Sequence, residues 1–157
     1  MNLIVNGFDH KDQISIIQNL KTDFHIDILF FIVYSKEDLH SISAVSNFHF
    51  VVSEIIQGEY IWDSAILPLD STIIERMIPF EPAIMRQMDR FETYLKRRIS
   101  YDERKEIYYR HLRYWNHIFS NYNIDLYLGS NIPHDIYDYV IYGLCRINNV
   151  KTLFFYQ

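Results

Sequence analysis

The sequence predicts an α/β protein with a doubly wound, mostly parallel sheet of about five strands, flanked by helices in three layers. Short apolar runs alternate with helical segments along the chain, which is typical of a parallel sheet with crossover helices. Residues 26–34 are apolar at almost every position, as expected for a strand that is buried on both faces. The 157 residues are 49% hydrophobic and 22% charged, which excludes a disordered chain and suits one domain.

The first half of the chain predicts three strands separated by two helices. The expected strands are the apolar runs 3–5, 26–34 and 48–52. Asp9 is placed to cap a helix that ends near Leu20, and Ser35 to cap a short helix over 36–43. Residues 60–69, interrupted by a proline, predict a short strand or an extended connection.

The second half predicts helices first and then two more strands. The expected helices are 71–78, 83–98, 100–122 and 134–147, and the expected strands are 124–128 and 150–155. Ser100 and Glu103 have the spacing of a capping box at the start of the longest helix. Along that helix apolar side chains recur every three or four residues, so we expect one broad stripe, with His111 and Trp115 in it, to face the core.

Charge and cysteine content exclude several classes of protein. The net charge of −5 gives no basic excess, so no nucleic-acid partner is expected. The single cysteine, Cys145, excludes an internal disulfide framework, and the seven histidines are scattered, so no metal site is expected. The first residues lack the features of a secretory signal, and no apolar run approaches the roughly 20 residues of a membrane span. These observations predict a cytoplasmic protein.

Motifs for common cofactors are missing from the sequence. Gly7 stands alone after the first strand, where a dinucleotide fingerprint needs three glycines, and no phosphate-binding loop occurs, so no cofactor is expected. The basic side chains in the middle of the chain alternate with acidic ones. Pairs such as Asp89 with Arg90, and Glu92 with Lys96, indicate a solvated, self-paired helix surface, and polyanion binding is the alternative.

Polar residues follow the first and the fourth expected strand. In parallel sheets ligands bind outside the carboxyl ends of the strands, so these residues are the candidate site. The candidate catalytic residues are His134, His10 and Asp9. The candidate ligand-binding residues are Asn6, Gly7, Ser130 and Asn131. We expect Asn6, Asp9, His10, Asn131 and His134 to line one cleft; the alternative is that the candidate residues are helix caps and solvated side chains.

One segment resembles a known group of proteins. Residues 122–142, with the sequence YNIDLYLGSNIPHDIYDYVIY, are similar to the N-terminal part of bacterial proteins of capsular or surface polysaccharide biosynthesis. There, a long aromatic-rich helix precedes a short strand, an Ile-Pro-His loop, a helix and another strand, and the likeness extends over about 100–155. The resemblance implies a B-type glycosyltransferase, in which an N-terminal Rossmann-like half holds the acceptor and a C-terminal half holds the sugar nucleotide. By position, it places the Ile132–His134 loop in the cleft.

The resemblance implies that residues 1–157 are one Rossmann-like domain, the N-terminal half of a larger two-domain protein. Its partner would be a sugar or glycan acceptor, and a nucleotide sugar would bind through the second domain. We therefore expect no transferase activity from this chain alone. Two other interpretations stay open. One is a non-catalytic Rossmann-like domain that forms a homodimer through its aromatic surface, which an exposed apolar patch would favour. The other is a small flavodoxin-like enzyme that binds a nucleotide.

Overall fold

The computed structural model describes residues 1–34, 42, 45–61, 66 and 68–155. Two compact units make up the chain. The first, which we call the sheet unit, consists of Met1–Ile55, Asn123–Ile132 and Val150–Gln157. The second, the helical unit, consists of Ile56–Tyr122 and Pro133–Asn149. Apart from Ile42, the helix predicted over 36–43 lies outside the described residues.

The sheet unit contains five parallel strands in the order β3-β2-β1-β4-β5. The strands are β1 (Asn2–Asn6), β2 (Asp27–Val33), β3 (Ser46–Val51), β4 (Leu126–Gly129) and β5 (Lys151–Phe154). This confirms the predicted α/β class with a parallel, Rossmann-like sheet. Parallel pairing requires a crossover connection, and along the chain a helix lies between β1 and β2 and another between β4 and β5.

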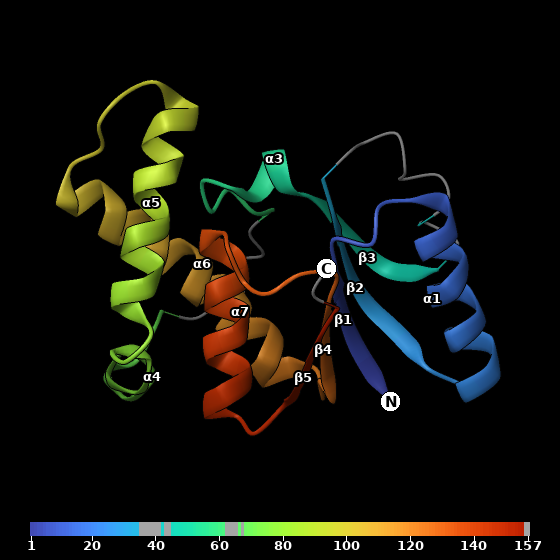
Figure 1. The fold of residues 1–157 in the computed structure, drawn as a ribbon. Coiled ribbons are helices and arrows are strands. Elements are labelled where there is room, and N and C mark those ends of the chain that lie inside the picture. The colour runs from blue at the N-terminus through green and yellow to red at the C-terminus, as the bar shows by residue number, and fades with distance from the viewer. Residues whose placement is uncertain (35–41, 43–44, 62–65, 67, 156–157) are drawn as a thin grey trace. The chain divides into compact units, whose positions relative to one another are not determined.

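The strand order reverses between β1 and β4. β1 pairs with β2 on one side and with β4 on the other, so these central strands form the topological switch point of the sheet. Because all strands run the same way, their carboxyl ends share one edge, which we call the carboxyl edge. The N-terminus lies at the opposite, amino edge (Figure 1).

Helix α1 (Lys11–Phe24) covers part of one face of this sheet through Ile14 and Ile17. These side chains pack in a buried cluster with alternate residues of the strands, such as Leu3, Val5 and Leu128. The predicted cap of α1 is wrong by one residue, because His10 and not Asp9 takes the N-cap position. A short helix, α3 (Val52–Ile55), follows β3.

The helical unit contains four helices among its described residues. They are α4 (Ser71–Met77), α5 (Glu81–Leu95), α6 (Tyr101–Asn121) and α7 (Ile136–Ile147). Ser100 caps α6 as predicted, because its hydroxyl accepts the Glu103 N–H at 3.2 Å. The stripe along α6 is also confirmed: His111 and Trp115 have no exposed surface. None of the described helices has the length and apolar content to cross a bilayer.

Candidate functional site

The loops after β1 and β4 meet at the switch point. The Ser130 N–H donates to the Asn6 carbonyl at 2.9 Å, and the Gly7 N–H donates to the Ile32 carbonyl at 2.9 Å. Two backbone hydrogen bonds therefore join the ends of β2, β1 and β4 just where the strands stop. Of the seven candidate residues, the structure places Asn6, Gly7, Ser130 and Asn131 at this edge of the sheet unit.

Gly7 is required for the close approach of the two loops. Its φ of +76° lies in the left-handed region, which costs a residue with a side chain roughly 1–2 kcal/mol. A Cβ atom at this position would also overlap the Ser130 hydroxyl and come within 3.5 Å of the Tyr34 ring. The absent side chain thus leaves the Ser130 hydroxyl against the backbone of the first loop.

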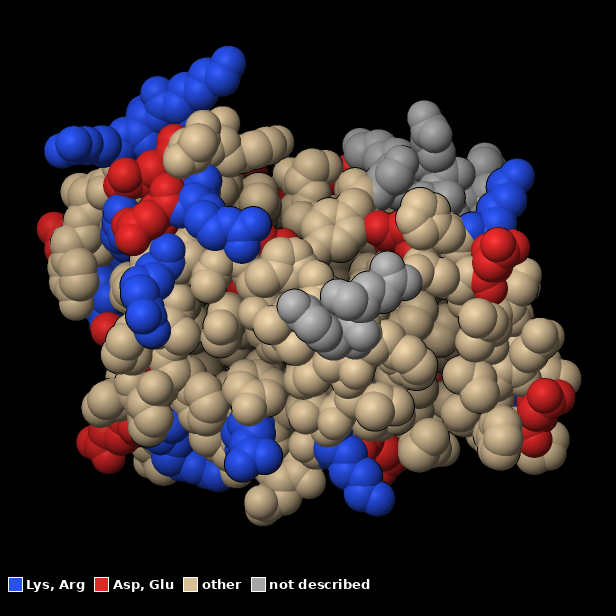
Figure 2. Space-filling model, viewed as in Figure 1, with Lys and Arg blue, Asp and Glu red and all other residues tan. Residues whose placement is uncertain are grey.

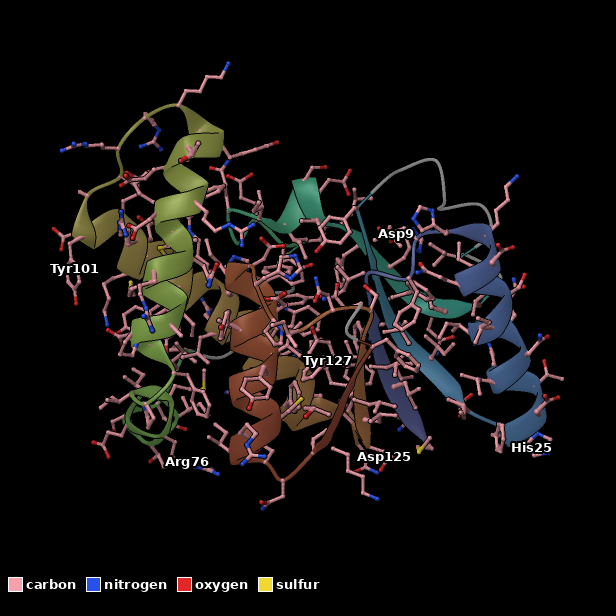
Figure 3. The ribbon with its side chains drawn as sticks, in the orientation of Figure 1. Asp9, His25, Arg76, Tyr101, Asp125 and Tyr127 are labelled. Atoms are coloured by element: carbon pink, nitrogen blue, oxygen red, sulfur yellow. The ribbon has the colours of Figure 1, made fainter. Side chains whose placement is uncertain are left out.

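Asn6 is buried at the end of β1, with 5% of its surface exposed. Its amide Nδ2 donates to the Tyr127 hydroxyl at 3.0 Å, so β1 and β4 are joined by side chains as well as by backbone. Tyr127 lies on β4, next to the central strand β1 (Figure 3). The sequence did not single out this tyrosine, which holds the candidate Asn6 in place.

Asp9 and His10 also lie at the carboxyl edge. The Tyr34 N–H, directly after β2, donates to Asp9 Oδ2 at 3.3 Å, and the His10 N–H donates to Gln13 Oε1 at 3.2 Å. Figure 3 shows Asp9 at the opposite edge of the sheet from Asp125, which precedes β4. Asp9 therefore connects the loops that follow β1 and β2, while the exposed His10 caps α1.

His134 belongs to the helical unit, at the start of α7. Helix α7 begins at Ile136 with Asp135 as its N-cap, so the predicted start at 134 and the capping alternative for Ser130 and Asn131 are wrong. Arg90 donates to the His134 carbonyl at 3.1 Å. Because His134 lies in the other unit, its place in one cleft with Asn6 and Asp9 stays a prediction.

Asp138 holds His134 from inside the helical unit. Its carboxylate accepts the N–H groups of His134, at 2.9 Å, and of Asp135, at 2.8 Å, and its Oδ2 lies 3.6 Å from His134 Nδ1. Burial raises the pKa of the Asp138 carboxyl well above its usual value. The sequence interpretation missed this residue, although Asp135 and Asp138 have the spacing of a capping box.

An apolar groove of about 580 Å³ crosses the sheet unit beside α1. Its walls include the strand residues Leu3, Leu126, Leu128 and Leu153 and the α1 residues Ile16, Ile17, Leu20 and Phe24. Phe8 and Phe155, whose rings meet edge to face at 5.8 Å, also line it. Composition alone does not reveal this groove, because it depends on which side chains the packing leaves exposed.

The helical unit buries a polar network around His111. Trp115 Nε1 donates to the Tyr60 hydroxyl at 2.8 Å, and that hydroxyl lies 2.7 Å from His111 Nδ1. His111 Nε2 lies 3.3 Å from the Ile56 carbonyl, which is the geometry of a neutral ring that accepts at Nδ1 and donates at Nε2. Burial lowers the pKa of His111 to about 4.

The charged surface of the helical unit is self-paired, as predicted, but through different partners. Figure 2 shows Lys and Arg interleaved with Asp and Glu over α5. Arg104 on α6 binds Asp89 at 2.7 Å and Glu92 at 2.6 Å on α5, so the predicted partners Arg90 and Lys96 are wrong. Helix packing, which sequence spacing does not reveal, sets these pairs.

No group of three or more His, Cys, Asp or Glu residues within the described ranges is arranged to hold a metal ion. Comparison of the chain with protein-family models, curated proteins and solved structures gave no match. A functional assignment therefore starts from the fold, the loops at its switch point and the resemblance of residues 122–142.

Proposed function

We propose that the chain is the acceptor-binding domain of a glycosyltransferase-like protein in surface polysaccharide biosynthesis. One observation carries the proposal. Asn6–Gly7 and Ser130–Asn131 flank the reversal of strand order, where open parallel sheets bind their ligands. The resemblance of residues 122–142 supplies the chemical class of that ligand, a sugar or glycan.

The groups at this edge suit a sugar. The Ser130 hydroxyl can both donate and accept a hydrogen bond, as each sugar hydroxyl can. Asn131 uses its Oδ1 to accept the Ile132 N–H at 2.8 Å, and its NH₂ group is a donor for an acceptor hydroxyl. Phe155, 54% exposed at the end of β5, offers an aromatic surface for the apolar face of a pyranose ring.

Transfer to the acceptor hydroxyl needs a base to take its proton. The proposed candidates for the base are Asp9 and His10, which follow β1, and His134, which precedes α7. Each of them carries a carboxylate or imidazole group that can accept a proton. The nucleotide sugar is proposed to bind a second domain, so the chain alone would bind acceptor without turnover. Turnover of a nucleotide sugar by purified 1–157 would contradict the proposal that this chain binds the acceptor and a second domain binds the nucleotide sugar.

Saccharide binding by the purified chain tests the proposal. A panel of mono- and disaccharides would be titrated by saturation-transfer NMR against wild type, Ser130→Ala and the control Ser120→Ala. Ser120 also carries a hydroxyl in a local hydrogen bond, to the Asn116 carbonyl at 2.8 Å, but lies on α6. We expect Ser130→Ala to weaken binding about two- to tenfold, the share of one hydrogen bond, and Ser120→Ala to leave it unchanged. Equal effects of both variants, or no saccharide binding, would contradict the proposal.

A further inference from the structure

The apolar groove of the sheet unit reaches the carboxyl edge, where the candidate site lies. Ser130 and Phe8 line one end of the groove and belong to the loops after β4 and β1. Met1 and Ile26, which precede β1 and β2, line the other end. A ligand in the groove would therefore have one end at the switch point and the other at the amino edge.

Polarity changes along the groove and not across it. The polar side chains among its lining residues are Gln13 and Ser130, and both lie toward the carboxyl edge, in the first turn of α1 and directly after β4. The rest of the lining, such as Leu126, Leu128 and Leu153, is apolar. An amphipathic helix lays one apolar face into its groove from end to end and needs no polar group at one end of it, whereas a molecule with a polar head and an apolar tail does.

The dimensions of the groove suit such a molecule. Its volume of about 580 Å³ lies within the range of roughly 300–1,000 Å³ found for ligand pockets. From Leu126 to Ser130 the wall formed by β4 extends about 13 Å, at about 3.3 Å per residue. Ile16, Phe24 and Leu153 line the groove, and each of them is at least 50% exposed. Large apolar side chains that stay exposed side by side form a surface on which an apolar ligand can pack.

We propose that the groove binds the apolar tail of an amphipathic acceptor, a glycan attached to an alkyl or acyl chain, whose sugar lies at Ser130. The proposal rests on the proposed function for the identity of the head group and on the groove for the tail. It adds a substrate class: the acceptor is a glycolipid and not a free saccharide. Burial of the tail would add binding free energy to that of the hydrogen bonds at the polar edge.

Alkyl glucosides of increasing chain length test the proposal. Methyl, hexyl and octyl β-D-glucoside, each below its critical micelle concentration, would be titrated calorimetrically against the chain. We expect affinity to rise roughly two- to fourfold per added methylene. Affinity that does not depend on chain length, with methyl glucoside bound, would overturn the tail groove while the proposed function stands. If octyl compounds bind equally well with any polar head, the proposed function is contradicted, because the sugar is not recognised. Only binding of the apolar tail in the groove would then stand.

A matched pair of variants locates the tail. Ile16→Asn removes an apolar wall of the groove at a residue that is 56% exposed, and Ile78→Asn makes the same change at a residue that is 57% exposed in the helical unit. We expect Ile16→Asn to remove most of the chain-length dependence without changing affinity for methyl glucoside, and Ile78→Asn to change neither.

Light scattering measures the oligomeric state of wild type and Ile16→Asn, and we expect both to be monomers. A homodimer that Ile16→Asn converts to a monomer would overturn the proposal, because a second copy would then cover the groove.

Discussion

The hydroxyl group of Ser130 lies against the backbone of Gly7, in the space that a Cβ atom on residue 7 would occupy. This contact joins the loops that follow β1 and β4. It depends on the positive φ of Gly7 and on the hydrogen bond from the Ser130 N–H to the Asn6 carbonyl. The geometry of the proposed acceptor site is therefore set by a residue that has no side chain.

Gly7→Ala should reduce both stability and saccharide binding. Alanine at φ +76° costs about 1–2 kcal/mol, and its Cβ must displace the Ser130 hydroxyl. The control is Gly58→Ala, because Gly58 has φ +72° and a Cβ there would lie 2.7 Å from Arg110 Cβ. Urea unfolding should show losses of similar size for the two variants, while only Gly7→Ala weakens saccharide binding by tenfold or more. Full binding by folded Gly7→Ala would show that the loop contact is not part of the site.

Two buried tyrosines should respond in opposite ways to loss of the hydroxyl. The Tyr108 hydroxyl is buried and has no hydrogen-bond partner among the described residues, so Tyr108→Phe should be neutral or stabilising. The Tyr60 hydroxyl bridges Trp115 and His111, so Tyr60→Phe should cost about 1–3 kcal/mol by leaving both partners unsatisfied. Chemical denaturation of the two variants checks this, and destabilisation by Tyr108→Phe that equals that of Tyr60→Phe would refute it.

Acid should destabilise the fold partly through His111. Its pKa is about 4 in the folded protein and about 6.5 in the unfolded chain, so the unfolded chain takes up the proton first as pH falls. The contribution is fully present above pH 6.5 and is lost between about pH 6.5 and 4, up to roughly 3 kcal/mol. The free energy of unfolding of wild type and His111→Gln would be compared from pH 7 to 4.5.

The pH dependence should be shallower in His111→Gln than in wild type. His117→Gln is the control, because His117 lies on the same helix but is half-buried and bonded locally to Asn121. That variant should keep the wild-type slope. Parallel curves for wild type and His111→Gln would mean that protonation of His111 does not govern this part of the acid response.

Asn6 and Tyr127 should be energetically coupled. The hydrogen bond between them is buried and joins β1 to β4, so its loss is not compensated by water. In a double-mutant cycle of Asn6→Ala and Tyr127→Phe, we expect a coupling free energy of about 1 kcal/mol from urea unfolding. A coupling near zero would show that the hydrogen bond between Asn6 and Tyr127 does not stabilise the fold.

The apolar runs predict all five strands to within two residues. The signal is clearest for β1, β2 and β4, which are mostly buried and carry mainly apolar residues. The long helix α6 is equally readable from its periodic stripe and the cap at Ser100. Both features are local, so the sequence around each position is sufficient to define them.

Features that depend on tertiary packing could not be predicted from the local sequence. Two adjacent polar residues, Asp9 and His10, compete for one cap, and the loop geometry selects His10. The partners of Arg104 depend on the contact between α5 and α6 and not on spacing within either helix. The groove beside α1 appears only once the strand order places β4 next to β1.

The most direct test of the account is the location of saccharide binding. In ¹⁵N–¹H spectra of the labelled chain titrated with the tightest-binding saccharide, we expect the largest shifts at residues 6–10 and 130–131. Asp125, at the amino edge of the sheet, serves as the internal reference and should not shift. Shifts confined to the amino edge or to α4–α6, with the two switch-point loops unchanged, would contradict the acceptor site proposed for this protein.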